Sequence, residues 1–134
     1  MTVSWKSLTV AALIYALPAA AQTGQFPNTP QGKLAAGFFA AVNSSDDEAL
    51  VTFQDANFSE TALKRRPREQ RIALGKQLRE QAGQLTLKAI KSASDKEIVA
   101  TASGSNLAPN AVLTISFSFT GSGAPKIDAV QITN

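Results

Sequence analysis

The sequence predicts an α+β domain in which three helices precede, and pack on one face of, a four-stranded antiparallel sheet. Apolar residues recur at helical spacing over much of residues 30–82, and after Gly83 the apolar period changes from 3.6 to 2. The chain has 134 residues, which is room for one domain. Because the strands follow the helices as a single run, the order favours segregated layers over alternating strand–helix units.

The first 21 residues are typical of a secretory signal peptide. Lys6 and the free amine give a positive end, and an apolar run of ten residues, Leu8–Leu17, follows. This run is shorter than the roughly 20 residues of a membrane span, and Ala19–Ala21 supplies the small residues that cleavage needs. We expect cleavage after Ala21 and export to the periplasm or the medium, with no transmembrane anchor; the alternative is a buried N-terminal helix. The expected parts are a signal peptide, a flexible leading segment and one domain, at residues 1–21, 22–28 and 29–134.

The predicted helices span about residues 30–42, 46–54 and 67–82, with a loop or broken helix over 55–67. Thr29 before Pro30 has the pattern of an N-cap followed by proline in the first turn. Ser45 and Glu48 match a capping box, which predicts the start of the second helix. Gly83 is expected to end the third helix in the left-handed conformation.

The predicted strands span about residues 85–91, 97–103, 111–120 and 127–132. The third strand has the clearest alternation, since apolar residues occupy every second position and small hydroxyl residues occupy most of the others. This pattern is typical of a strand with one buried and one solvated face. The last strand changes phase by one residue, which predicts a bulge near Asp128 and Ala129.

The composition excludes several kinds of chemistry. Cysteine is absent, so the chain has no disulfide and no thiolate metal ligand. Histidine, the side chain that most often acts as a general base, is also absent. After cleavage it would also lack tyrosine and tryptophan, which disfavours base stacking and nucleic-acid binding. The acidic run Asp46–Glu48 fits helix capping better than a metal site. We therefore expect no cofactor, no metal and no catalytic residue; the acids to inspect for burial are Asp55, Glu60 and Asp128.

The opening of the domain resembles the nuclear transport factor 2-like superfamily, also described as cystatin-like, ketosteroid-isomerase-like or SnoaL-like, in its exported bacterial form. The resemblance lies in Thr29-Pro30-Gln31-Gly32-Lys33-Leu34 and in Phe38-Phe39-Ala40-Ala41-Val42-Asn43-Ser44-Ser45-Asp46, which is similar to the helix, Asn-Ser-Gly-Asp, helix opening of that superfamily. Here Ser45 replaces the usual glycine. The resemblance implies a curved sheet around a long helix, with a cone-shaped cavity. Its members range from isomerases and dehydratases to structural dimers, so the fold alone does not determine activity.

Two sets of residues are candidates for binding. One is an apolar set that would line the cone cavity or simply fill it as core: Phe38, Phe58, Leu113, Ile115, Phe117 and Phe119. The other lies in a basic stretch, where Arg68, Arg71 and Arg79 fall on one helical face. That face would contact an anionic partner or would simply be solvated. If it is a surface of either kind, reversing the three charges to glutamate should leave folding intact.

The function that the sequence favours is that of an exported, non-enzymatic binding or interaction module. Its partner would be a protein or an envelope component, and a homodimer could form through the hydroxyl-rich face of the sheet. One alternative is a carrier that holds a small apolar ligand in the cone cavity. The other is a cavity enzyme of the isomerase or dehydratase type without the usual residues. A filled cavity favours the first, an open apolar cavity the second, and a buried acid in an open cavity the third.

Overall fold

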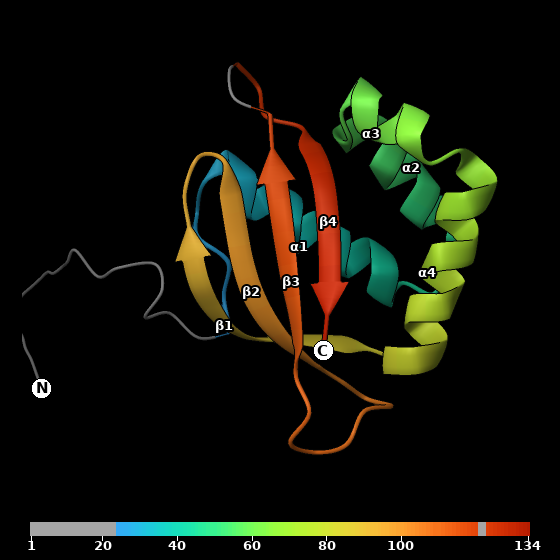
Figure 1. Cartoon of the computed structure of the whole chain (residues 1–134), viewed down its shortest axis with the longest axis vertical. Coiled ribbons are helices and arrows are strands. Elements are labelled where there is room, and N and C mark those ends of the chain that lie inside the picture. The colour runs from blue at the N-terminus through green and yellow to red at the C-terminus, as the bar shows by residue number, and fades with distance from the viewer. Residues whose placement is uncertain (1–23, 121–122) are drawn as a thin grey trace, which may run out of the picture.

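The computed structural model describes residues 24–120 and 123–134 (Figure 1). The expected signal peptide lies outside the described residues. Within them, the helices are α1 (Pro30–Asn43), α2 (Asp47–Asn57), α3 (Glu60–Arg65) and α4 (Arg68–Ala82). The strands are β1 (Leu85–Ala93), β2 (Glu97–Gly104), β3 (Leu113–Phe119) and β4 (Ile127–Thr133). Helices on a four-stranded antiparallel sheet confirm the predicted α+β class.

The caps of the first two helices agree only in part with the sequence. The hydroxyl of Thr29 accepts the backbone N–H of Gly32 at 3.0 Å, as an N-cap should. The cap of α2 is Asp46 and not Ser45, because Ser45 has φ +60° and makes the turn itself. Asp46 is therefore the extended residue before the helix, and its carboxylate accepts the N–H of Glu48 at 3.0 Å.

The stretch that the sequence left undecided contains a fourth helix. α2 continues to Asn57, and after Phe58 the short helix α3 begins, capped by the hydroxyl of Ser59. α4 follows Pro67, which offers no side-chain cap. Gly83 ends α4 as predicted, with φ +73° but with ψ −142°, outside the left-handed helical region. The expectation of three helices was therefore wrong by one short element.

The four strands pair in the order β1-β2-β3-β4, each antiparallel to the next. Ser118 pairs with Ala129 and Phe119 with Ile127, so Asp128 is an extra residue on β4. This confirms the predicted bulge. The bulge turns β4 locally at the place where α3 approaches, since the N–H of Ser59 donates to the carbonyl of Ile127 at 2.9 Å.

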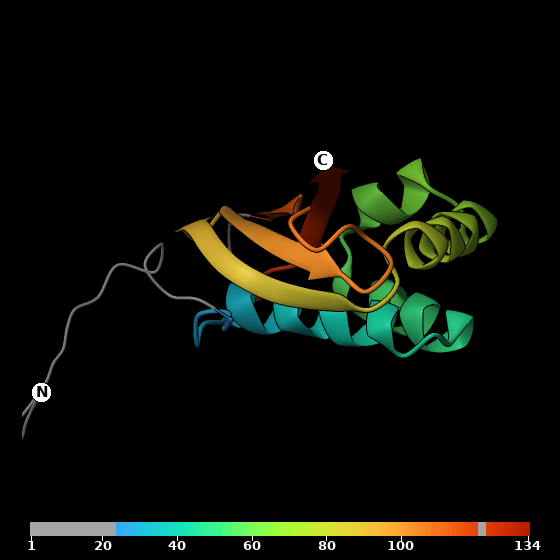
Figure 2. The ribbon, with the colours of Figure 1, turned by 90° about the horizontal axis from the view of Figure 1, so that it is seen from below.

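Figures 1 and 2 show α1 running across one face of the sheet, with α4 beside the edge strand β4. The inner face of the sheet packs on α1 around the ring of Phe117, which is fully buried. Its ring centroid lies 5.6 Å from that of Phe38 and 6.4 Å from that of Phe39. The hydroxyl residues of β3 lie on the other face and are partly exposed, as the alternation predicts. Among the residues described, no helix is both long and apolar enough to cross a membrane.

Candidate functional site

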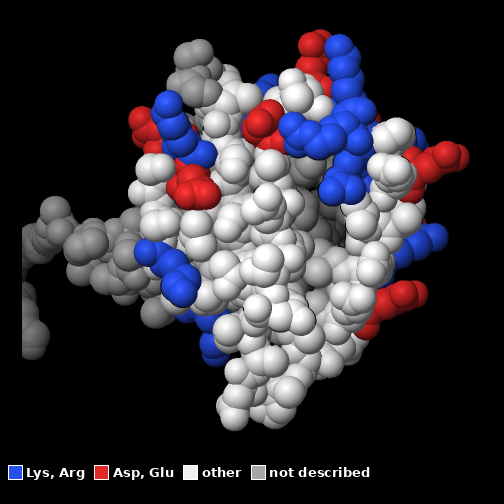
Figure 3. All heavy atoms as spheres, viewed as in Figure 1, with Lys and Arg blue, Asp and Glu red and all other residues white. Residues whose placement is uncertain are grey.

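A cavity of about 280 Å³ lies between the helices and the β4 edge of the sheet. Figure 3 shows it as a hollow beside the sheet, with basic side chains gathered above it. Its apolar walls include Phe38, Val42, Leu50, Phe58, Leu78 and Val130. Its polar lining includes Gln54, Arg65, Arg66, Arg71, Asp128 and Gln131. The cavity is therefore amphipathic, with apolar walls and a predominantly basic polar part.

Helical spacing brings the apolar walls together. Phe38 and Val42 are four residues apart on α1, so they lie on the same face. On β4, Val130 is paired with Phe117 and therefore points to the inner face of the sheet. On α4, a Cβ at Gly75 would lie 2.5 Å from Cδ2 of Leu50. Glycine at this position thus lets α4 pack closely against α2, which closes one side of the cavity.

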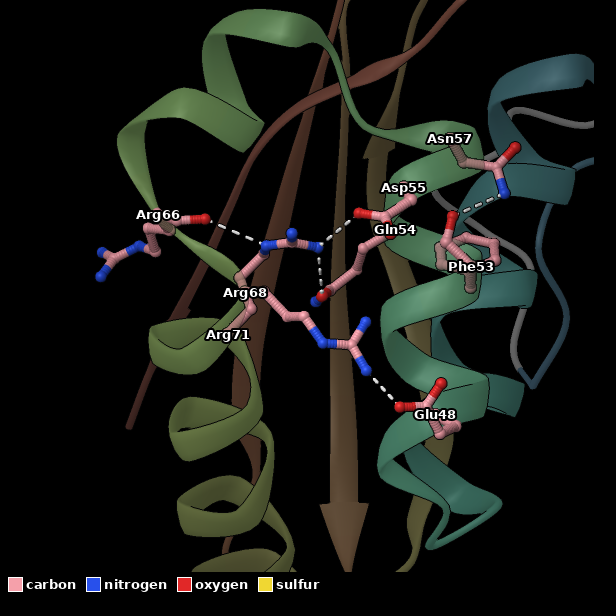
Figure 4. Close-up of polar contacts among 8 residues, drawn as sticks. All are labelled: Glu48, Phe53, Gln54, Asp55, Asn57, Arg66, Arg68 and Arg71. Atoms are coloured by element: carbon pink, nitrogen blue, oxygen red, sulfur yellow. Dashed lines mark hydrogen bonds and ion pairs between the residues drawn. The ribbon is translucent and has the colours of Figure 1, made fainter.

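The side chain of Arg71 lies at the polar part of the cavity and is only 9% exposed. Its Nε donates to the carbonyl of Arg66 at 3.0 Å, and its Nη1 donates to Oε1 of Gln54 at 3.3 Å (Figure 4). Nη1 also lies 3.1 Å from Oδ1 of Asp55. These contacts hold the guanidinium in one orientation between α4 and α2. Its third nitrogen, Nη2, makes no hydrogen bond with any residue that the structure describes.

Asp128 reaches the cavity because the bulge inserts it into β4. Its Oδ1 accepts the hydroxyl of Ser59 at 2.6 Å. Its backbone carbonyl accepts Nη1 of Arg65 at 3.2 Å. The same bonds anchor α3 to β4, so the polar rim and the local fold depend on the same residues.

The predicted basic face needs a correction. Arg68, Arg71 and Arg79 do share one face of α4, but that face is turned to α2. Arg68 pairs with Glu48, Arg71 with Asp55, and Arg79 with Asp47. Lys76 also lies 3.6 Å from Asp47. The reason is electrostatic complementarity, since α2 carries carboxylates along the side that meets α4.

The ion pairs between α2 and α4 shift the pKa of one carboxyl group, that of Asp47. The hydrogen bond from Arg79 lowers the pKa of Asp47 below its ordinary value, and the charges of Arg79 and Lys76 act in the same direction. The Arg79 side chain is 16% exposed and that of Arg68 is 48% exposed. The contacts of this helix face thus range from half-exposed to buried along α4.

The predicted apolar set is divided by the structure. Phe38 and Phe58 line the cavity, and Leu113 borders a second hollow near the ends of α4 and β4. The other three, Ile115, Phe117 and Phe119, are buried in the core beside α1. The expected set is therefore core along the middle of the sheet, and Phe38 and Phe58 border the cavity beside α4.

The polar residues at the cavity were missed as a site by the sequence analysis. Arg71 was assigned to a surface, and Gln54 was not considered. Of the three acidic residues singled out from the sequence, Asp128 lines the cavity, whereas Asp55 and Glu60 do not. In the described part of the chain, no three acidic, histidine or cysteine side chains are placed to hold a metal ion.

Comparison of the chain with family models, with curated proteins and with solved structures gives no match. The functional interpretation therefore depends on the geometry of the cavity. That geometry suits a small molecule that is mainly apolar and that accepts hydrogen bonds at one end.

Proposed function

We propose that the protein is an exported binding domain that holds a small apolar ligand in the cavity between α4 and β4. The observation that carries the proposal is a cavity of about 280 Å³ beside the core, with apolar walls and polar residues at its rim. Small-molecule sites are concave and mostly apolar with a few polar groups, which describes this lining.

The open cavity changes the order of the functions that the sequence favoured. An interaction module that works through its surface does not need an apolar space inside the domain. Its expected contact face is also engaged, since Arg71 and Arg79 pair with α2. A protein or envelope partner and a homodimer through the sheet remain predictions of the sequence.

Export and ancestry belong to the proposal as well. The proposed export rests on the signal-peptide pattern of residues 1–21 and the expected cleavage after Ala21. A place among the nuclear transport factor 2-like proteins, with their curved, cone-shaped sheet, is supported by the order of helices and strands and by the Asn43-Ser44-Ser45-Asp46 turn. This turn joins α1 to α2, as it does in the superfamily that it resembles.

The test uses the full-length chain expressed with its own N-terminus and purified after export. The intact mass of the product reports whether the first 21 residues have been removed. Isothermal titration calorimetry with 1-octanol then reports binding. Burial of its eight carbon atoms at about 0.8 kcal/mol each contributes about 6 kcal/mol at most. The dissociation constant should therefore lie above about 20 μM, because the entropic cost of association opposes binding.

Two valine variants locate the binding site. Val130→Phe places a larger side chain in the cavity and should weaken 1-octanol binding by about tenfold or more. Val112→Phe makes the same change at a position that is 46% exposed and does not line the cavity, so its affinity should match that of the wild type. Absence of octanol binding, or equal loss in the two variants, would refute the proposal.

A further inference from the structure

We infer that the natural ligand of this cavity carries a single negative charge, which Arg71 and Arg65 bind at the rim while its apolar part lies between α1 and β4. The inference rests on the proposed function and adds the chemical class of the ligand. Three arginines and one aspartate are the charged residues that line the cavity in the described part of the chain. The lining thus has an excess of positive charge.

Arg71 is the strongest indication of an anionic ligand. A guanidinium has five N–H donors, and those on Nε and Nη1 are used by acceptors on α2 and before α4. Nη2 has no partner among the described residues, although the side chain borders the cavity and is 9% exposed. Because the other contacts fix the plane of the guanidinium, an anion would meet a donor that is already oriented.

Arg65 supplies a second positive charge on the β4 side of the rim. Its Nη1 donates to the backbone carbonyl of Asp128, which places the guanidinium at the bulge. The Asp128 carboxylate already accepts the Ser59 hydroxyl at 2.6 Å. Arg66 contributes its charge less directly, since in Figure 4 its side chain points away from Arg71. A cationic ligand head would be repelled by the two guanidinium groups, whereas an anionic head would accept charge-assisted hydrogen bonds from them.

The same rim indicates one negative charge rather than two. Asp55 lies beside Arg71 and Asp128 lies beside Arg65, so a dianionic group would approach two carboxylates. The volume limits the apolar part. At about 30 Å³ for a water-sized group, the cavity holds on the order of nine non-hydrogen atoms. Octanoate, a monoanion with an eight-carbon chain, therefore serves as the probe.

The experiment measures the affinities of octanoate, octanamide and octylamine for the purified protein by calorimetry near pH 7. The three probes share the chain length and differ in charge. Octanoate should bind at least tenfold more tightly than octanamide, and octylamine should bind more weakly than octanamide. Raising the ionic strength should weaken octanoate binding and leave 1-octanol binding unchanged.

Arginine variants test the assignment of the rim. Arg65→Gln removes an exposed charge at the cavity and should weaken octanoate binding by about fivefold or more, with 1-octanol unchanged. Lys64→Gln is the matched control, because it removes the neighbouring exposed charge, which does not line the cavity. Arg71→Gln should weaken octanoate binding further. Far-ultraviolet circular dichroism shows whether the Arg71→Gln variant is folded. The comparison of Arg65→Gln with Lys64→Gln does not depend on that variant.

The outcomes separate this inference from the proposed function. Suppose that 1-octanol binds and that Val130→Phe weakens its binding, but that octanoate binds no better than octanamide. The inference of an anionic ligand is then refuted, and the proposed cavity function stands. If none of the probes binds, both are refuted. If Lys64→Gln weakens octanoate binding as much as Arg65→Gln does, the general field of the surface and not the rim attracts the anion, and the assignment to Arg65 is wrong.

Discussion

Replacing Arg71 by methionine should reduce the free energy of unfolding by about 2–4 kcal/mol. Methionine keeps most of the buried stem of the side chain, so the change removes mainly the guanidinium. Oε1 of Gln54 would lose its donor in a residue that is 6% exposed, at about 1–3 kcal/mol. The Arg66 carbonyl would lose the hydrogen bond from Nε of Arg71, whereas Asp55 is 54% exposed and its ion pair contributes little.

Arg68→Met is the matched control for this prediction. It is the same substitution three residues earlier on α4, where the pair with Glu48 is exposed, and it should change the stability by about 1 kcal/mol or less. Urea denaturation followed by circular dichroism measures both variants, with equal m-values as the condition for comparison. Equal losses for the two variants would show that the buried contacts of Arg71 do not hold α4 against α2.

The same geometry reverses an expectation of the sequence analysis. Glutamate at positions 68, 71 and 79 was expected to leave folding intact. In the structure, glutamate at 71 would bury a carboxylate beside Asp55, and glutamate at 79 would face Asp47. We therefore expect the triple reversal to destabilise the protein by more than Arg71→Met alone.

Two further predictions concern acid stability and the core. The folded state lowers the pKa of Asp47, so its carboxylate stabilises the fold above the ordinary aspartate pKa, and this contribution is lost as the pH falls through the folded value. The difference in urea midpoint between the wild type and Asp47→Asn should therefore be largest near neutral pH and shrink near pH 3; a constant difference would contradict the role of the charge. Phe117→Ala should cost about 3–5 kcal/mol by urea denaturation, and Phe26→Ala less, because Phe117 is fully buried and Phe26 only partly; equal costs would contradict this core assignment.

The parts of the fold that local signals determine could be predicted from the sequence. Thr29 and Pro30 start α1 through local backbone bonding, and Gly83 ends α4 through its positive φ. The phase change at Asp128 needs only the period-2 alternation of a strand. Each of these signals acts within a few residues, so no knowledge of tertiary contacts is required.

The cavity could not be predicted because it depends on how helices face each other. A helical wheel shows that Arg68, Arg71 and Arg79 share a face, but their charges alone predict that this face is exposed to solvent. Only the carboxylates of the neighbouring helix reveal the true direction, since Asp47 and Asp55 are eight residues apart on α2 and meet α4. Likewise, α3 has only six residues, and its position depends on the bonds of Ser59 to β4.

The polar rim also bears on which ligand the cavity would accept. Arg71, Gln54 and Asp128 lie at this rim, and their polar groups can be hydrated when the cavity is empty. A monoanionic amphiphile would replace that water at the rim and fill the apolar part, so the side chains that can be hydrated in the empty cavity also select what can occupy it.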